Sequence, residues 1–156
     1  DWLDTIPNPN KVDYGYSEFI GEIDTTIQGR ATYDQLLAWD IEFPYKGLDN
    51  YVMSTSKVGK DQNVTFINGE DVEVIEDIKL KAKKNIWLIG GGKINGWFLQ
   101  KGLIDELRVF IMPIILPDGL DLFTGQIKDF GLELINSKTY PSGVLELKYK
   151  LASWAN

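Results

Sequence analysis

The sequence contains no cysteine and no histidine. Without cysteine there can be no disulfide framework, thiolate nucleophile or cysteine-bound metal. Without histidine there can be no Ser-His-Asp or Cys-His catalysis, no His-ligated zinc and no imidazole acting as acid or base near neutral pH. We therefore predict no metal centre, and any proton transfer must use a carboxylate, tyrosine, lysine or water.

Positive charge and long apolar runs are also scarce. The chain has 23 acidic and 16 basic residues, a formal charge of −7, and a folded acidic surface repels nucleic acid and anionic membranes. No apolar run approaches the roughly 20 residues of a membrane span, and the first residues do not resemble a signal peptide. We expect a soluble, cytoplasmic protein that binds neither nucleic acid nor membranes. It must hold any anionic ligand with backbone amides and a few bases.

The length and composition favour one globular domain. The 156 residues, 44% of them hydrophobic, can build one core but not two ordinary ones. The chain has no repeat, low-complexity tract or linker.

Apolar periodicity and turn residues predict alternating helices and strands. The predicted helices cover 16–24, 32–39, 72–83 and the residues after Gly92; the predicted strands cover 25–28, 50–54, 64–67, 85–89, 106–112, 132–140 and 145–151. Strand 85–89, the following helix and strand 106–112 have the lengths of a right-handed crossover with parallel strands. The last two strands flank Pro141-Ser142-Gly143, and the final one alternates apolar and charged residues, which predicts an antiparallel hairpin. The predicted class is α/β with a mixed, mainly parallel sheet.

Three consecutive glycines, Gly90-Gly91-Gly92, separate a predicted strand from a predicted helix. Such a turn leaves backbone N–H groups uncovered, and the helix N-terminus adds a positive dipole, so a phosphate can approach closely. The alternative is a tight turn that only needs positive φ. The segment is not a Walker loop, because Ile94 follows Lys93, nor a dinucleotide fingerprint, because Asn95 replaces its third glycine.

Two further segments supply anion donors at predicted strand ends: Gly29-Arg30-Ala31-Thr32 and Ser54-Thr55-Ser56-Lys57. Each also has a structural interpretation. Thr32 can be a helix N-cap and Arg30 a solvated charge, while the serines can form a hydroxyl-rich turn.

In combination, three motifs resemble the dihydrofolate-reductase superfamily, including the reductase domain of the bifunctional riboflavin-biosynthesis deaminase/reductase. They are the stretches 27–33, IQGRATY; 51–56, YVMSTS; and 86–94, IWLIGGGKI. The segment 101–107 and Met112-Pro113 look more like the riboflavin-type reductases and their small uncharacterised relatives. The resemblance covers nearly the whole chain and implies a single-domain, three-layer α/β/α fold.

The resemblance also implies an NADPH site. Arg30 and Thr32 would hold its phosphates, the serine segment would lie near the adenosine 2′-phosphate, and the glycine turn would embrace the diphosphate and nicotinamide side. The implied cofactor residues are Gly29, Arg30, Thr32, Ser54, Thr55, Ser56, Ile89, Gly90, Gly91, Gly92, Lys93, Ile94 and Asn95. In the superfamily the first two glycines of the turn are joined by a cis peptide bond, which we therefore expect between Gly90 and Gly91.

The substrate side is less well defined. Tyr16 and Phe19 can wall a flat acceptor, although Phe19 can equally be a core residue. The arginine with which true dihydrofolate reductases grip the glutamate tail would fall near Leu48, which argues against folate. Asp13 and Glu18 only lie near the position of the family's pterin-binding carboxylate. No catalytic acid is assigned.

The leading hypothesis is an NADPH-dependent reductase of the riboflavin-type branch, acting on a pteridine, a ribosylaminouracil phosphate or a similar heterocycle. The alternatives are dihydrofolate reductase proper and a non-catalytic NADP-binding module. The resemblance further implies a homodimer. Family members carry a core strand ahead of a segment like Asp1-Trp2-Leu3, so we expect an N-terminal segment to precede Asp1.

Overall fold

The computed structural model describes residues 2–39 and 41–152. The chain divides into two compact units. We call Tyr16–Trp97 with Asp121–Gln126 the parallel unit, and Asp1–Gly15, Phe98–Leu120 and Ile127–Asn156 the antiparallel unit.

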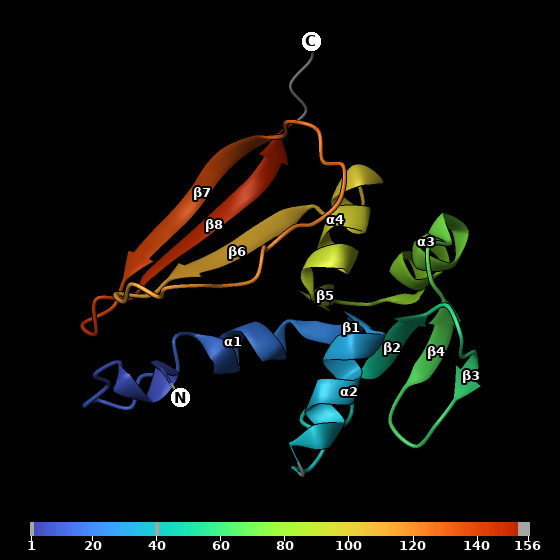
Figure 1. Cartoon of the computed structure of the whole chain (residues 1–156), viewed down its shortest axis with the longest axis horizontal. Helices are drawn as coiled ribbons and strands as arrows, with labels where there is room; N and C mark the ends of the chain where they lie inside the picture. Colours follow the sequence, from blue (N-terminus) through green and yellow to red (C-terminus); the bar gives the residue numbers. More distant parts are fainter. Residues whose placement is uncertain (1, 40, 153–156) are drawn as a thin grey trace. The chain divides into compact units, whose positions relative to one another are not determined.

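The parallel unit contains a five-stranded sheet in the order β3-β4-β2-β1-β5 (Figure 1). Its parallel strands are β1 (Ile23–Gly29), β2 (Asp49–Ser54), β4 (Thr65–Asn68) and β5 (Asn85–Gly90). The short β3 (Gly59–Lys60) pairs antiparallel to β4 at one edge. In β1, six of the seven residues are buried, as expected for a parallel strand covered on both faces.

Four helices follow or precede these strands: α1 (Tyr16–Gly21), α2 (Arg30–Ala38), α3 (Val72–Lys81) and α4 (Gly92–Gln100). In α3, a capping side chain and the spacing of apolar residues explain why this segment is helical. The Asp71 side chain accepts hydrogen bonds from the backbone N–H groups of Glu73 and Val74, at 3.1 and 3.3 Å, and so caps the first turn. Ile75 and Ile78 are buried one turn apart.

The core of the parallel unit lies between α2 and the sheet. Tyr33 and Leu36 of α2 pack with Val52 of β2 and Phe66 of β4, which are 0% and 2% exposed. The Tyr33 and Phe66 rings meet edge to face, with centroids 5.7 Å apart. This packing fixes the start of α2 against the ends of the strands.

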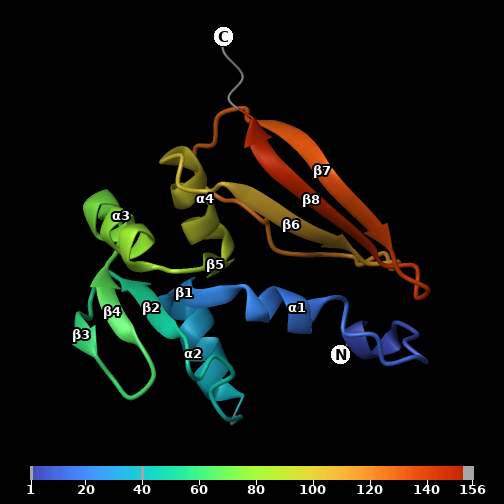
Figure 2. The ribbon, with the colours of Figure 1, turned by 180° about the vertical axis from the view of Figure 1, so that it is seen from behind.

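The antiparallel unit contains a three-stranded sheet in the order β6-β8-β7, formed by β6 (Glu106–Ile111), β8 (Leu145–Ala152) and β7 (Gly131–Thr139) (Figure 2). Gly143, with φ of +84°, lies in the turn between β7 and β8. A short 3-10 helix, η1 (Trp2–Thr5), lies near the N-terminus.

The predicted α/β class, with a mainly parallel mixed sheet and an antiparallel C-terminal hairpin, is confirmed. The predicted parallel crossover between strands 85–89 and 106–112 is wrong, because β5 and β6 belong to different sheets. Strand β6 pairs antiparallel with β8, and opposite charges meet across that pair. Arg108 lies 2.6 Å from Glu146, and Lys148 lies 2.8 Å from Glu106. The alternation of charged and apolar residues in β6 therefore indicated an antiparallel partner.

The first helix is also shorter than predicted. It ends at Gly21, and β1 already begins at Ile23. Among the described residues, no helix combines the length and the apolar character needed to cross a membrane.

Candidate functional site

The carboxyl ends of the parallel strands lie along one edge of the sheet. In the register of the ladders, Gln28 of β1 pairs with Gly90 of β5, and Gly29 pairs with Met53 of β2. Strands β1 and β5 lead directly into α2 and α4. The three segments predicted to bind phosphate therefore gather at this edge, where open α/β sheets bind their ligands.

The expected cis peptide bond between Gly90 and Gly91 is confirmed. Gly90 is buried, with φ of +106°, and its carbonyl oxygen accepts a hydrogen bond from the Thr32 hydroxyl at 3.2 Å. Gly91 is exposed, and a Cβ there would have the Thr32 hydroxyl oxygen, at 3.9 Å, as its nearest neighbour. The backbone around Gly91 is therefore open to a ligand.

The third glycine of the turn is required by another part of the chain. A Cβ at Gly92 would lie 2.5 Å from the Asp121 carbonyl oxygen, and the Thr124 N–H donates to the Gly92 carbonyl at 3.0 Å. Asn95 donates from its side chain to the Leu122 carbonyl at 2.9 Å. The segment 121–126 thus crosses the first turns of α4. The positive φ of the tight-turn interpretation is found at Gly90 and not at Gly92, where the close approach of residue 121 requires a glycine instead. The sequence analysis did not identify this crossing segment.

At the other helix start, Gly29 is the N-cap of α2, with φ of −79° and ψ of 157°, and no side chain caps the helix. The N-cap interpretation of Thr32 is therefore wrong, because Thr32 lies inside the first turn. A Cβ at Gly29 would come within 2.8 Å of the Ile94 side chain, so α4 packs closely on this turn. Arg30 pairs with Asp34 at 2.6 Å, and its side chain is 42% exposed.

The serine segment combines a turn with a basic group. Ser54 is buried, and its hydroxyl oxygen accepts from the N–H groups of Ser56 and Lys57 at 3.2 and 3.0 Å, so it is a turn residue. Thr55 and Ser56 are exposed. The Lys57 ammonium lies 4.0 Å from the centroid of the Phe66 ring, and the Arg30 guanidinium carbon lies 5.7 Å from it. Two cations thus share one ring at this edge. Lys57 belongs to the anion-donor segment named from the sequence, although it was not among the implied cofactor residues.

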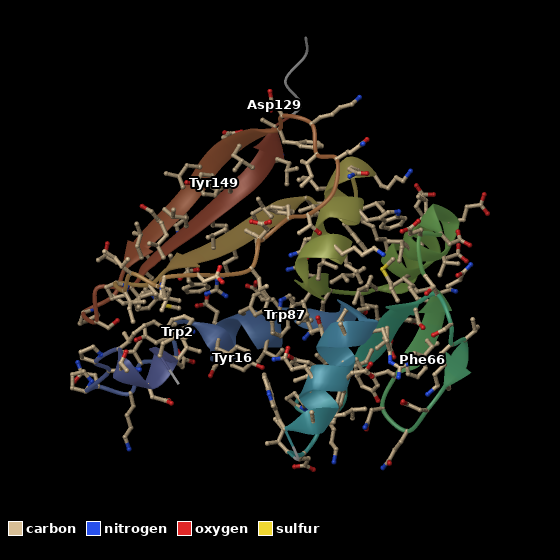
Figure 3. The ribbon with its side chains drawn as sticks, viewed as in Figure 1. Trp2, Tyr16, Phe66, Trp87, Asp129 and Tyr149 are labelled. Carbon is tan, nitrogen blue, oxygen red and sulfur yellow. The ribbon has the colours of Figure 1, made fainter. Side chains whose placement is uncertain are left out.

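A cluster of aromatic rings surrounds Trp87 of β5 (Figure 3). Tyr16 and Phe19 of α1 contact Trp87 with centroids 6.4 and 5.1 Å away, and Tyr45 lies at 5.4 Å. Burial, together with nearby Tyr16, raises the pKa of the Tyr45 hydroxyl. The structure therefore brings the two predicted substrate residues together on one ring. Trp87 lies inside a recognised motif, but sequence spacing could not show that Tyr45 joins it.

Among the described residues, every carboxyl group with a shifted pKa is shifted downwards, so none stands out as a catalytic acid. Burial opposes ionisation of Asp24, yet hydrogen bonds from Thr25 and from the backbone of Lys83 and Lys84 lower its pKa on balance. The pKa of Asp61 is lowered in the same way, against burial, by the N–H groups of residues 63 and 64 and the Tyr33 hydroxyl. Both side chains are therefore ionised carboxylates that accept hydrogen bonds from neighbouring groups. Asp61 lines a polar cavity of about 190 Å³ at the amino ends of β2 and β4, which includes none of the predicted cofactor residues.

Comparison with known proteins identifies the family. The family described as RibD C-terminal domain matches residues 50–145. The chain belongs to the RibD C-terminal domain family. This reductase-like family agrees with the resemblance inferred from the three motifs.

Two relatives of this chain are proteins of Bacillus subtilis (strain 168). One is the uncharacterized protein YyaP, 30% identical over 163 residues, covering 96% of this chain and 82% of YyaP. The other is the uncharacterized protein YwjB, 32% identical over 145 residues, covering 92% of this chain and 82% of YwjB.

Solved structures show the same fold. A protein of Shewanella sp. PV-4 named "Putative riboflavin biosynthesis protein" is 30% identical, with a TM-score of 0.85 over 97% of this chain and 87% of that one. A pyrimidine reductase-like protein of Corynebacterium diphtheriae, 16% identical, has a TM-score of 0.66 over 93% of this chain and 84% of its own. Acinetobacter baumannii RibD, 11% identical, has a TM-score of 0.62 over 91% of this chain and 51% of its own.

Proposed function

We propose that this member of the RibD C-terminal domain family is an NADPH-dependent oxidoreductase of the riboflavin type, which transfers hydride to a pyrimidine- or pteridine-like heterocycle. The observation that carries the proposal is the gathering of the three segments predicted to bind phosphate at the carboxyl edge of one parallel sheet. The riboflavin-related names of the structural neighbours support the choice of substrate class.

The two helix starts fit a diphosphate. Helices α2 and α4 each have nine residues; α2 follows its N-cap Gly29, and α4 begins at Gly92. An uncapped helix start presents unpaired N–H groups and a positive dipole end, which together stabilise a phosphate. At Gly91 no side chain stands between the backbone and the ligand. We assign the diphosphate to the amides of residues 30–32 and 91–94, with the Thr32 hydroxyl between them.

The basic pair fits the 2′-phosphate that distinguishes NADPH from NADH. Arg30 and Lys57 both lie on the Phe66 ring, and the exposed hydroxyls of Thr55 and Ser56 are close to Lys57 along the chain. Guanidinium and ammonium groups bind phosphate by charge-assisted hydrogen bonds. We expect selectivity for NADPH over NADH to depend on these side chains.

The aromatic cluster around Trp87 offers an apolar surface beside which hydride transfer can take place. Bound nicotinamide would supply the hydride, and the protein has to orient it against a flat acceptor and exclude water. Trp87 and Phe19 form a partly buried apolar wall, and Tyr16 is 45% exposed beside them. An acceptor ring can stack on such a wall.

Titration with NADPH tests the cofactor assignment. Intrinsic tryptophan fluorescence should be quenched on binding, and Arg30→Ala should weaken binding by about ten- to a hundredfold, as expected for one charge-assisted phosphate contact. Lys81→Ala is the matched control, because Lys81 also pairs with an acid at i, i+4 on a helix of the same unit. The NADPH assignment would be refuted if millimolar NADPH did not quench tryptophan fluorescence and if Arg30→Ala behaved like the unsubstituted protein.

Turnover tests the catalytic part. Oxidation of NADPH with a pyrimidine or pteridine acceptor supports a reductase, whereas binding without turnover across a panel of heterocycles supports a non-catalytic NADP-binding module. Methotrexate should not raise the melting temperature, because Leu48 cannot pair with a glutamate tail. A clear rise would indicate dihydrofolate reductase proper.

A further inference from the structure

The polar cavity of about 190 Å³ lies at the amino ends of β2 and β4, so the candidate cofactor site is at the other ends of these strands. Its lining comes from the parallel unit: the start of β2, the end of β3 with the turn that follows it, and the start of β4 (Figure 1). The lining residues are Leu48, Asp49, Asn50, Lys60, Asp61, Gln62, Asn63, Val64 and Thr65. Sites for cofactors and drug-sized ligands are larger and mainly apolar. A ligand of this cavity must therefore be small and polar.

Hydrogen bonds fix the buried part of the lining, which is Asn50. Its side chain is 7% exposed, and its amide oxygen accepts a hydrogen bond from the Thr26 hydroxyl at 2.6 Å. Its amide nitrogen donates to the carbonyl oxygens of Tyr45 and Leu48 at 3.0 and 2.8 Å. Both polar atoms of this side chain therefore have partners within the protein, so Asn50 shapes the cavity and does not need a ligand.

The Asp61 carboxylate fixes the turn between β3 and β4. One of its oxygens accepts hydrogen bonds from the N–H groups of Asn63 and Val64, both at 2.9 Å. The other oxygen accepts from the Tyr33 hydroxyl of α2 at 2.8 Å. These three bonds tie the turn to itself and to a helix, and a site that is already ordered loses little conformational entropy when a ligand binds.

Two opposite charges of the lining are left without such partners. Asp49 and Lys60 are both exposed, and neither side chain forms an ion pair or a hydrogen bond with any residue that the structure describes. Although both line the same cavity, the Asp49 carboxylate and the Lys60 ammonium lie more than 4.0 Å apart. The cavity therefore presents one free negative and one free positive group, with room between them for a third.

We propose that this cavity binds a small zwitterion of the free amino acid type, with the ligand's ammonium at Asp49 and its carboxylate at Lys60. Such a ligand neutralises both side chains at once, whereas a phosphate would leave the carboxylate unpaired and a divalent cation needs more oxygen ligands than one free carboxylate. The side-chain amides of Gln62 and Asn63 and the hydroxyl of Thr65 offer donors and acceptors to a polar ligand side chain. The proposal does not depend on the cofactor assignment.

The first test is an NMR titration of the full chain, labelled with ¹⁵N, with a panel of L-amino acids. L-Glutamine, which adds a side-chain amide to the two charges, should bind with a Kd of about 1 mM or tighter and shift the amide signals of residues 60–65. N-acetyl-L-glutamine lacks the ammonium and L-glutaminamide lacks the carboxylate, so each should bind at least about tenfold more weakly. The proposal is overturned if no amino acid of the panel binds at about 10 mM, or if all three glutamine compounds bind equally.

The second test removes each charge of the cavity separately. Asp49→Asn and Lys60→Gln should each weaken L-glutamine binding at least about tenfold, and because both positions are exposed the urea midpoint should not change. Asp77→Asn and Lys81→Gln are the matched controls, since these side chains are 70% and 75% exposed on α3 and lie outside the cavity. All four variants should keep NADPH affinity within about twofold, so a failure here is distinct from a failure of the cofactor assignment. Unchanged glutamine binding in both cavity variants would place the ligand elsewhere and exclude this site.

Discussion

The glycines around the candidate site serve different purposes, and the space at each shows which. Gly91 has open space where a side chain would begin, whereas a Cβ at Gly96 would collide with the Thr124 carbonyl oxygen. Both residues lack a positive φ. Gly91 is therefore free to receive a ligand, and Gly96 is required by the crossing segment 121–126.

This difference predicts opposite results for two alanine variants. Gly91→Ala should change the free energy of unfolding by less than about 1 kcal/mol but weaken NADPH binding about tenfold or more, because the methyl group blocks the approach of a phosphate. Gly96→Ala should destabilise the fold by about 1–3 kcal/mol, because the helix must move away from residue 124. Urea unfolding and NADPH titration check both. Wild-type affinity in Gly91→Ala would remove this glycine from the site.

Gln28 is a polar residue with an unusual environment. Its side chain is 0% exposed, and neither amide atom has a hydrogen-bond partner among the described residues. Thr26, two residues earlier on the same face of β1, does have a partner, because its hydroxyl donates a hydrogen bond to the Asn50 side chain at 2.6 Å. An unpaired buried amide costs about 1–3 kcal/mol of stability.

Replacement by an apolar side chain of similar size should therefore stabilise the protein. Gln28→Met should raise the free energy of unfolding by about 1 kcal/mol, whereas Asn50→Leu, which leaves Thr26 unpaired, should lower it by about 1–3 kcal/mol. Urea unfolding at neutral pH measures both. A clear loss of stability in Gln28→Met would show that the amide has a partner, such as an internal water.

At the scale of elements, a partly buried ion pair links β6 to β8 and to the turn after β7. Glu146 accepts from Arg108 and from the Tyr140 hydroxyl, both at 2.6 Å. Burial opposes ionisation of Glu146, but Arg108 and Tyr140 lower its pKa below the usual 4.5. Burial and the Glu146 carboxylate raise the pKa of Tyr140 to about 12.

These shifts predict how stability depends on pH. Because the pKa of Glu146 is lower in the folded state, its stabilising effect is complete above the ordinary Glu range and is lost as the pH falls through the folded value. Glu146→Gln should therefore flatten the loss of unfolding free energy below about pH 5. Tyr140 acts on the alkaline side, because its raised pKa gives stability below about pH 10 that is lost toward pH 12. Urea unfolding across pH checks this; an unchanged acid slope in Glu146→Gln would exclude the carboxylate as its source.

Most helices and strands could be predicted from local patterns of apolar and turn residues in the sequence. Helix α3 was predicted because apolar residues, among them Ile75 and Ile78, repeat at helical spacing. The partner of β6 was not predicted, because pairing depends on strands far along the chain. The crossing of α4 by residues 121–126 rests on contacts of the same kind, Thr124 with Gly92 and Leu122 with Asn95. The sequence of residues 121–126 contains no local feature that predicts their contacts with α4.

At the scale of the whole molecule, the chain contains a five-stranded and a three-stranded sheet. The parallel unit holds every predicted cofactor and substrate residue, and the edge strand β7 belongs to the antiparallel unit. Ile135→Lys, at a half-exposed position of β7, should therefore leave NADPH affinity within about twofold.

The most direct measurement is a crystal structure with NADP⁺ bound. We predict its diphosphate within hydrogen-bonding distance of the amides of residues 91–94 and 30–32, and its 2′-phosphate beside Arg30 and Lys57. A dinucleotide bound away from the carboxyl edge of β1, β2 and β5, or a 2′-phosphate that contacts neither base, would contradict the account.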